Sequence, residues 1–331
     1  MNRKVGVGVI GVGAFGSLHA KVYSELADCE LRAIADTDPE RLDRVCASLG
    51  VTGCTDYRQI LEMADVHAVS VCTTDELHVE AAVLAAHAGK HVFVEKPLAL
   101  TPQGCDAIIE AADDTGVLLT VGHILRFDPR YVTAQREIAA GSIGEPVHMF
   151  IRRNNSILSA ERLRSHTSAL FFLGIHDIDF ANWCMGQRPE RVQAQAVSKI
   201  LRDTPDTVLA LLGYPGGAVA ALEASWVLPR SMVCGLDARF DVVGTQGALY
   251  VNGGSQNVTI ARDRIEQPEL FYAPDVHGRS TGILRDELSH FVRCVIEGRQ
   301  PVVSGRDGRM AVEVACAIET AYRTGDVVRI E

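Results

Sequence analysis

The sequence predicts an α/β protein with an N-terminal doubly wound parallel sheet and a second α+β domain built on a large, mostly antiparallel open sheet. Three observations support this fold class. A glycine-rich turn links the first strand to the first helix, strand and helix signals alternate as far as residue 122, and longer β runs follow. A chain of 331 residues is also long for a single core. We therefore expect two domains, at residues 1–122 and 123–331.

The turn within residues 5–16, VGVGVIGVGAFG, gives the strongest local signal. Its Val and Ile residues predict a buried strand, which runs directly into Gly11, Gly13 and Gly16. In this spacing the first glycine permits a tight turn, the second lets the backbone approach a pyrophosphate, and the third allows close packing of helix and strand. The N–H groups that begin the following helix suit a phosphate. The segment therefore predicts a dinucleotide-binding Rossmann domain, with a unit that binds nothing or another nucleotide as the alternative.

Asp36 ends the next predicted strand, residues 31–35, and lies 25 positions after Gly11. A carboxylate at this place accepts hydrogen bonds from the adenosine ribose and repels a 2′-phosphate, so NAD is favoured over NADP. The alternative is that Asp36 only belongs to the turn 37–40, TDPE, which predicts the N-terminus of a helix.

In the rest of the N-terminal domain, predicted strands alternate with predicted helices. We expect a helix near 39–49, a strand at 66–72, a helix at about 75–88 closed by Gly89, a strand at 91–94, a helix capped by Thr101-Pro102 and a strand at 117–121. Short apolar strands that alternate with helices are typical of a doubly wound parallel sheet.

The pattern of predicted elements changes after residue 122. We expect helices at about 129–140, 168–185, 282–297 and 307–324, with β runs at 147–153, 191–199, 206–214, 217–227, 236–244, 247–251, 257–261 and 327–330. A hairpin turn at 214–217, YPGG, joins two of these runs. The pattern favours a mostly antiparallel sheet with helices packed on it.

Composition excludes several classes of protein. The net charge of −10 argues against a nucleic-acid-binding surface. The sequence contains no run of 18 apolar residues, so a membrane span is not expected. The N-terminus has no signal-peptide cleavage pattern. Nine scattered cysteines without a CxxC pair fit reduced, buried thiols in a cytoplasmic protein. We expect no metal site, no membrane partner and no nucleic-acid partner.

Lys96 follows the predicted strand 91–94 within Glu95-Lys96-Pro97. The carboxyl ends of parallel strands border the ligand crevice, so an ammonium there could hold a substrate oxygen and stabilise a developing alkoxide. The proline stiffens the turn, with a cis bond as one way to do so. The alternative is a loop lysine without a role.

His176 is the candidate proton acceptor. On a regular helix it shares a face with Phe172 and Phe180, and apolar surroundings keep an imidazole neutral and able to accept a proton. The alternative is a core histidine bonded to a backbone carbonyl. Asp177 and Asp179 are expected on a solvated or arginine-paired face, although Asp179 could orient the imidazole.

These motifs together resemble the glucose-fructose oxidoreductase and inositol dehydrogenase (Gfo/Idh/MocA) family over essentially the whole chain. The resemblance is carried by GVGAFG at 11–16, GKHVFVEKPLA at 89–99, GHILRFDP at 122–129 and GIHDID at 174–179. It implies a Rossmann domain at 1–122, and a substrate-binding and oligomerisation domain at 123–331 whose sheet forms homodimer or homotetramer contacts. It also implies oxidation of a secondary alcohol with NAD, with Lys96 and His176 as catalytic residues.

The resemblance also implies a set of binding residues. The cofactor-binding residues expected are Gly11, Gly13, Ala14, Phe15, Gly16, Asp36, Thr73, Thr74, His78, Glu95 and Lys96. The substrate-binding residues expected are Arg126, Arg153, Asn155 and His166. The chain departs from the family at Phe172, where an aspartate is usual, and at 73–75, TTD, where Thr-Pro-Asn is more frequent.

The sequence therefore predicts an NAD-dependent oxidoreductase that acts on a ring secondary alcohol of a sugar, a nucleotide sugar or a cyclitol such as inositol. His176 takes the hydroxyl proton, and Lys96 holds the same oxygen. Two alternatives stay open: a glycoside hydrolase that retains NAD and oxidises its substrate transiently, and a non-catalytic cofactor-sensing regulator. Lys96 and His176 argue against the regulator, whereas Phe172 leaves room for it.

Overall fold

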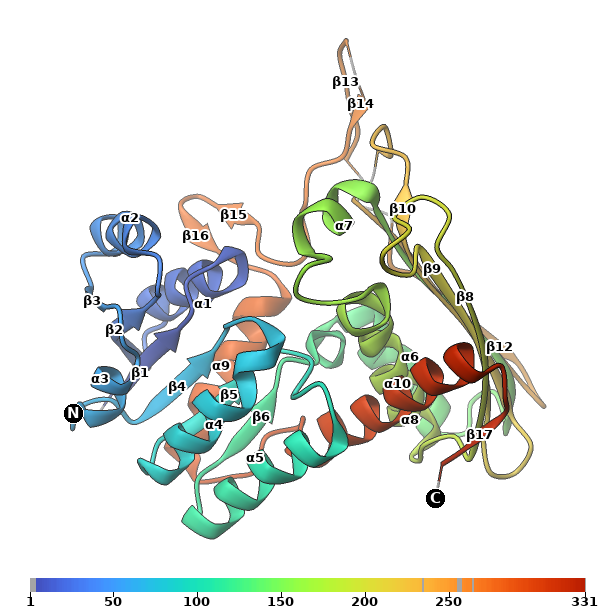
Figure 1. The fold of residues 1–331 in the computed structure, drawn as a ribbon, viewed down its shortest axis with the longest axis horizontal. Coiled ribbons are helices and arrows are strands. Elements are labelled where there is room, and N and C mark those ends of the chain that lie inside the picture. The colour runs from blue at the N-terminus through green and yellow to red at the C-terminus, as the bar shows by residue number, and fades with distance from the viewer. Residues whose placement is uncertain (1–3, 234, 255–257, 264, 331) are drawn as a thin grey trace. The chain divides into compact units, whose positions relative to one another are not determined.

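The computed structural model describes residues 4–233, 235–254, 258–263 and 265–330. Two compact units form within it (Figure 1): residues 1–124 with 271–309, and residues 125–270 with 310–331. The first boundary lies close to the expected one at 122. The division differs from the expectation in one respect, because residues 271–309 return to the first unit. Each unit is described below by itself.

The first unit contains a six-stranded sheet in the order β3-β2-β1-β4-β5-β6, in which every neighbouring pair is parallel. The strands are β1 (Val5–Ile10), β2 (Cys29–Ala35), β3 (Thr52–Cys54), β4 (Ala68–Val71), β5 (His91–Val94) and β6 (Leu119–Val121). Strand order reverses between β1 and β4, the switch point at which such sheets bind ligands. The predicted doubly wound sheet is confirmed.

The helices of this unit begin where the sequence supplies caps. They are α1 (Ala14–Glu25), α2 (Pro39–Leu49), α3 (Arg58–Glu62), the short helix η1 (Asp75–Leu77), α4 (His78–His87), α5 (Pro102–Thr115) and α9 (Ile283–Glu297). The side chains of Asp38 and Thr101 accept hydrogen bonds from backbone N–H groups in the first turns of α2 and α5. Right-handed crossovers place α1 and α4 on opposite faces of the sheet (Figure 1).

The returning segment completes the first unit. Helix α9 buries Leu284, Leu288 and Phe291, and the ring of Phe291 lies 5.8 Å from that of Phe93 in β5. The hairpin of β15 (Asp275–Val276) and β16 (Arg279–Ser280) precedes it. The segment returns because the sheet face that α1 begins to cover needs a second apolar helix to exclude water.

The second unit is built on a seven-stranded sheet in the order β12-β11-β7-β10-β9-β8-β17. Its strands are β7 (Pro146–Ser156), β8 (Arg191–Val197), β9 (Thr207–Gly213), β10 (Val219–Leu228), β11 (Leu236–Gly244), β12 (Ala248–Asn252) and β17 (Val328–Arg329). All neighbours are antiparallel except β7 and β10. The expectation of a mostly antiparallel sheet is confirmed.

One predicted strand lies elsewhere. Of the run 257–261, residue 257 falls outside the described residues, and Ile260–Ala261 form β13. Within the described ranges this strand pairs with β14 (Ile265–Glu266) in a separate two-stranded ribbon.

Helices cover one face of the seven-stranded sheet. They are η2 (Ile124–Phe127), α6 (Pro129–Ala139), α7 (Ile157–Leu163), the π-helical turn η3 (Leu170–Gly174), α8 (Ile175–Met185) and the part of α10 (Gly305–Thr324) that follows residue 309. Ile151 and Phe240 point to this face and are fully buried. Phe150 and Leu211 point to the opposite face and are exposed. The sheet therefore has one open, partly apolar side.

Among the described residues, none of the helices has the length and hydropathy needed to cross a bilayer. The described part of the chain also holds no group of three metal-binding side chains. The eight cysteines within it are free thiols, and Cys234 lies outside it.

Candidate functional site

The glycine turn has the geometry that its spacing predicts. Gly11 has a φ of +84°, and a Cβ there would lie 2.8 Å from the carbonyl oxygen of Cys72. A Cβ on Gly16 would lie 1.8 Å from the Gly11 carbonyl oxygen, so only glycine allows α1 this close to β1. No described atom lies within 4 Å of a Cβ on Gly13. The space beside Gly13 therefore fits the close approach of a pyrophosphate.

The difference between Gly13 and Gly16 leads to a prediction. Gly13→Ala leaves the melting temperature within about 2 °C, because the added methyl meets open space, but weakens NAD binding by about tenfold or more. Gly16→Ala destabilises the protein by about 2 kcal/mol or more, since the methyl collides with backbone. Thermal unfolding and NAD titration of both variants check this. Equal loss of stability in the two variants would contradict it.

Ala14 and Phe15 begin α1, and no side chain caps this helix at Gly13. The ring of Phe15 packs edge-on against Tyr272, 6.0 Å between centroids. The first turn of a twelve-residue helix therefore presents backbone N–H groups beside the glycine turn, the arrangement that suits a phosphate.

Asp36 is buried at the end of β2 and tied to the glycine turn. Its Oδ2 accepts from the backbone N–H of Val12 and its Oδ1 from that of Asp38, both at 2.9 Å. The N-cap of α2 is Asp38, whose side chain accepts from the N–H of Arg41. Asp36 thus contributes to the capping turn and also lies at the strand end where a ribose is expected. Its contact with the ribose stays a prediction.

Lys96 follows β5, and its peptide bond to Pro97 is cis, as the sequence suggested. The neighbouring Glu95 accepts a hydrogen bond from the buried His19, 2.9 Å from Nε2 to Oε1. Burial raises the pKa of Glu95, but the hydrogen bond of His19 and the charge of Lys96 outweigh it and hold that pKa below its usual value. An ionised carboxylate therefore lies beside the lysine.

Thr73 and Thr74 follow β4, next to Gly11 across the switch point. The Thr73 hydroxyl donates to the carbonyl of Thr74 at 3.3 Å. His78, at the start of α4, lies between this turn and the lysine loop: its Nδ1 is 2.7 Å from the Pro97 carbonyl oxygen, and its Nε2 is 3.3 Å from that of Thr73.

The predicted cofactor contact of His78 stays a prediction, and the structure gives this residue a further role. The residue is 1% exposed, and both ring nitrogens face backbone carbonyls. A neutral imidazole can donate to one of them and a protonated one to both. His78 therefore bridges two loops at the strand ends.

Glu287 is a buried residue of the first unit that sequence reasoning missed. It lies on α9, and within the described part of the chain neither carboxylate oxygen has a hydrogen-bond partner. Burial, together with the nearby charge of Glu95, raises the pKa of Glu287 well above its usual value. The periodicity of apolar residues in the sequence cannot reveal this residue. Glu287 lies next to Glu95 only because α9 returns to the first sheet.

His176 occupies the second position of α8, directly after the π-helical turn of residues 170–174. The side chain is half-buried. Phe180 is fully buried and packs on Tyr131 and Phe240 at centroid distances of 4.8 and 4.6 Å. The predicted common face with Phe172 assumed an unbroken α-helix, and the wider π turn changes that angular spacing. π turns are frequent at functional sites.

Phe172 belongs to an apolar cluster. It packs against Ala160, Ala169, Leu173 and Trp226, which are buried. The position at which the family usually has an aspartate is therefore filled by a side chain that joins α7, η3 and β10.

Arg126 and Arg153, predicted to bind substrate, form buried ion pairs with the two aspartates of α8. Arg126 Nε and Nη2 lie 2.9 and 2.6 Å from the carboxylate of Asp179, and the guanidinium stacks on Trp183. Arg153 Nε and Nη2 lie 2.7 and 3.0 Å from that of Asp177. The arginine-paired interpretation of these aspartates is thus confirmed. Both guanidinium groups position α8, and their contact with substrate stays a prediction.

The remaining predicted substrate residues lie near the end of β7 and after α7. Asn155 is half-buried and opposite Leu236 in the sheet. His166 is exposed, and its backbone N–H donates to the Leu163 carbonyl. Their role toward substrate stays a prediction.

The arrangement in the first unit fits a dinucleotide. Gly11, Thr73 and Lys96 follow three adjacent parallel strands, so they lie along one edge of the sheet with the open space at Gly13 and the carboxylate of Asp36. When bound there, NAD supplies an acceptor for hydride. Within the second unit, taken by itself, the half-buried imidazole of His176 lies on a helix that two ion pairs hold in place.

Comparison with known proteins agrees with this geometry. Residues 5–123 match the model of an oxidoreductase family with an NAD-binding Rossmann fold, and residues 131–250 match the GFO/IDH/MocA C-terminal domain. The chain is 31% identical to scyllo-inositol 2-dehydrogenase (NAD(+)) of Bacillus subtilis, an alignment that covers 100% of this chain and 98% of that protein. It is 30% identical to myo-inositol 2-dehydrogenase of Thermotoga maritima, with 98% of each covered.

A solved structure shows the same fold. The crystal structure of myo-inositol 2-dehydrogenase from Lactobacillus plantarum superposes with a TM-score of 0.87 at 26% identity and covers 99% of this chain and 100% of its own. The chain therefore belongs to the Gfo/Idh/MocA family of NAD-binding oxidoreductases.

Proposed function

We propose that this enzyme is an NAD-dependent dehydrogenase of a ring secondary alcohol, on a cyclitol such as inositol or on a related sugar. The observation that carries the proposal is the position of Lys96 at the end of β5, on the sheet edge that holds the glycine turn. The names of the relatives, which are inositol 2-dehydrogenases, support the class of substrate.

The proposed roles follow from the chemistry of the side chains. His176 accepts the hydroxyl proton on an imidazole nitrogen as the O–H bond breaks, and NAD, when bound, would supply the acceptor for the carbinol hydrogen as hydride. Lys96 donates a hydrogen bond to the same oxygen and stabilises negative charge on it.

Phe172 bears on the identity of the substrate. An apolar ring in place of a carboxylate removes an acceptor for one substrate hydroxyl. We therefore propose a substrate that lacks this hydroxyl or carries a substituent there, unless Asn155, Arg153 or His166 supplies the contact.

The direct test is the absorbance of NADH on mixing the enzyme and NAD with a panel of inositol isomers, their deoxy and O-methyl derivatives, sugars and glycosides. The proposal expects net NADH with at least one cyclitol or sugar. Release of sugar from a glycoside without net NADH would favour the NAD-retaining hydrolase instead. No turnover with any polyol, despite NAD binding, would favour the regulator.

We further propose that the open face of the seven-stranded sheet joins copies of the chain into a dimer or tetramer. Tyr250, Phe150 and Leu211 lie on this face, linked across the sheet by the register pairs Asp241–Tyr250, Asp241–Phe150 and Ala221–Leu211. Large apolar side chains exposed in one row of a sheet, with Asp241 between Tyr250 and Phe150, suit an interface between copies of the chain.

Leu211→Glu tests this assembly. A charge on the covered face is expected to convert the oligomer to monomer, because its burial without a partner is unfavourable. Light scattering after size exclusion measures the mass, and Val302→Glu, which changes an exposed residue of the first unit, is the control. A monomeric wild-type protein, or an unchanged mass of the variant, would contradict the proposal.

A further inference from the structure

The carboxylate expected to hold the adenosine ribose already has a cation against it. Arg41 Nη1 lies 3.1 Å from both oxygens of Asp36, and its Nη2 lies 3.0 Å from Oδ2 of Asp38. The backbone N–H groups of Val12 and Asp38 donate to the same Asp36 carboxylate. Both oxygens of Asp36 therefore accept hydrogen bonds, and the guanidinium of Arg41 in contact with them neutralises the negative charge of Asp36.

The cation is the solvent-facing member of the pair. The Arg41 side chain is 40% exposed, whereas that of Asp36 is 5% exposed. Contacts to the described residues use three of the five guanidinium N–H donors, so two stay available to a ligand. A guanidinium fork with spare donors matches the geometry of a phosphate.

This arrangement changes the expected cofactor selectivity. An unpaired carboxylate at the ribose rejects NADP by repelling its 2′-phosphate. Here Arg41 cancels that charge and presents donors to solvent from the adjoining turn of α2. The neutralised pair no longer repels a phosphate strongly, and its cation can hold one.

We propose that Arg41 is a specificity-determining residue that contacts the 2′-phosphate of NADP, so that the enzyme accepts NADP as a second dinucleotide while it prefers NAD. The inference rests on the NAD site of the first unit and does not depend on the identity of the polyol. A charge-assisted hydrogen bond of this type corresponds to an affinity change of about 10- to 100-fold.

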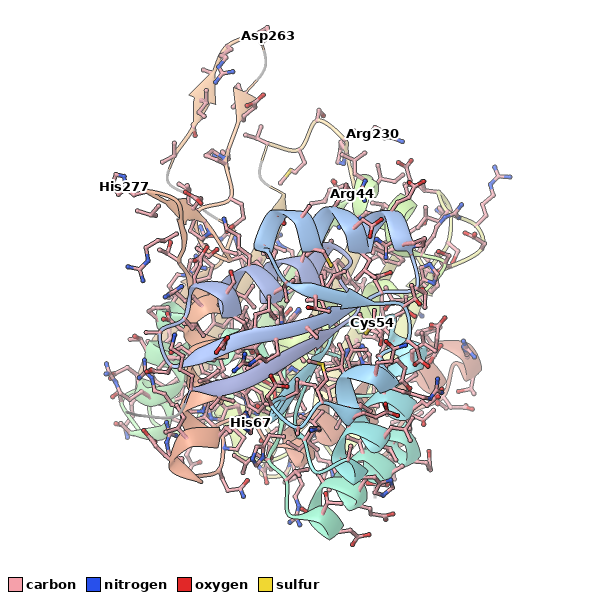
Figure 2. The ribbon with its side chains drawn as sticks, turned by 90° about the vertical axis from the view of Figure 1, so that its left-hand side faces the viewer. Arg44, Cys54, His67, Arg230, Asp263 and His277 are labelled. Carbon is pink, nitrogen blue, oxygen red and sulfur yellow. The ribbon has the colours of Figure 1, made fainter. Side chains whose placement is uncertain are left out.

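The first experiment compares binding of NAD and NADP by isothermal titration calorimetry. Arg41→Gln is expected to weaken NADP binding by about tenfold or more and to leave NAD binding within about threefold. The control is Arg44→Gln, which removes an exposed arginine further along α2 (Figure 2) and is expected to leave the ratio of the two affinities unchanged. An unchanged ratio in Arg41→Gln would overturn the proposal.

A second comparison separates direct contact from charge cancellation. Asp36→Asn removes the charge that Arg41 cancels, so Arg41→Gln in this background removes only the attraction of the guanidinium itself for the phosphate. Adenosine 2′,5′-bisphosphate, titrated into Asp36→Asn and into the double variant with Arg41→Gln, is expected to bind the double variant at least about fivefold more weakly. Equal affinity would overturn the proposed contact. Neither titration needs polyol turnover, so failure here is distinguishable from failure of the proposed activity.

Discussion

Replacing His176 by glutamine lowers kcat for polyol oxidation by about 10²-fold or more, and replacing Lys96 by methionine has an effect of the same size. Glutamine keeps a polar side chain of similar reach but cannot accept the substrate proton at neutral pH. Methionine keeps the apolar stem of lysine and removes the cation. Initial rates of NADH formation with saturating NAD measure both effects.

The affinity for NAD separates loss of catalysis from loss of the cofactor site. We expect the dissociation constant of NAD to change by less than about threefold in His176→Gln, because that residue belongs to the second unit. His87→Gln, at an exposed position in the last turn of α4, is the matched control and should retain full activity. Full activity of His176→Ala would assign the proton transfer to another group.

The second large effect concerns stability. Asp177→Ala lowers the free energy of unfolding by about 3–5 kcal/mol, because it leaves the guanidinium of Arg153 buried without its counter-ion. Burial disfavours the charged form of Arg153, but the attraction of Asp177 outweighs it and holds the pKa of this arginine above its usual value. The variant loses this attraction, but an arginine side chain is not deprotonated in proteins, so the buried charge stays and destabilises the folded state. Urea unfolding followed by circular dichroism measures the change.

Two controls make this prediction specific. Asp203→Ala, which breaks the exposed pair with Arg164, should cost less than about 1 kcal/mol. The double variant Arg153→Met with Asp177→Leu should recover most of the stability, because it removes both charges. A loss in Asp177→Ala no larger than that in Asp203→Ala would show that the buried pair contributes nothing.

The features that the sequence could predict are those in which a local pattern determines the structure. The glycine spacing at 11–16 requires one backbone path, the caps at Asp38 and Thr101 begin helices where expected, and Glu95-Lys96-Pro97 follows a strand. In each of these the interacting groups lie within a few residues or on one element, so that periodicity and residue type are sufficient.

The features that the sequence could not predict depend on contacts between distant segments. The pair Arg153–Asp177 joins β7 to α8 and gives Arg153 a positioning role that the sequence did not indicate. Glu287 comes next to Glu95 only because α9 returns to the first sheet. The spacing of apolar residues in 168–185 does not predict the π turn before His176, because one widened turn leaves that spacing in the sequence unchanged.

The return of residues 271–309 to the first unit has a consequence for biosynthesis. Leu284, Leu288 and Phe291 of α9 fill the apolar layer beside β1 and β5, so the N-terminal residues alone leave that layer open to water. The unit that is translated first can therefore complete its core only after most of the chain has left the ribosome. A truncated product that stops at residue 124 should aggregate or require a chaperone, whatever its affinity for nucleotides.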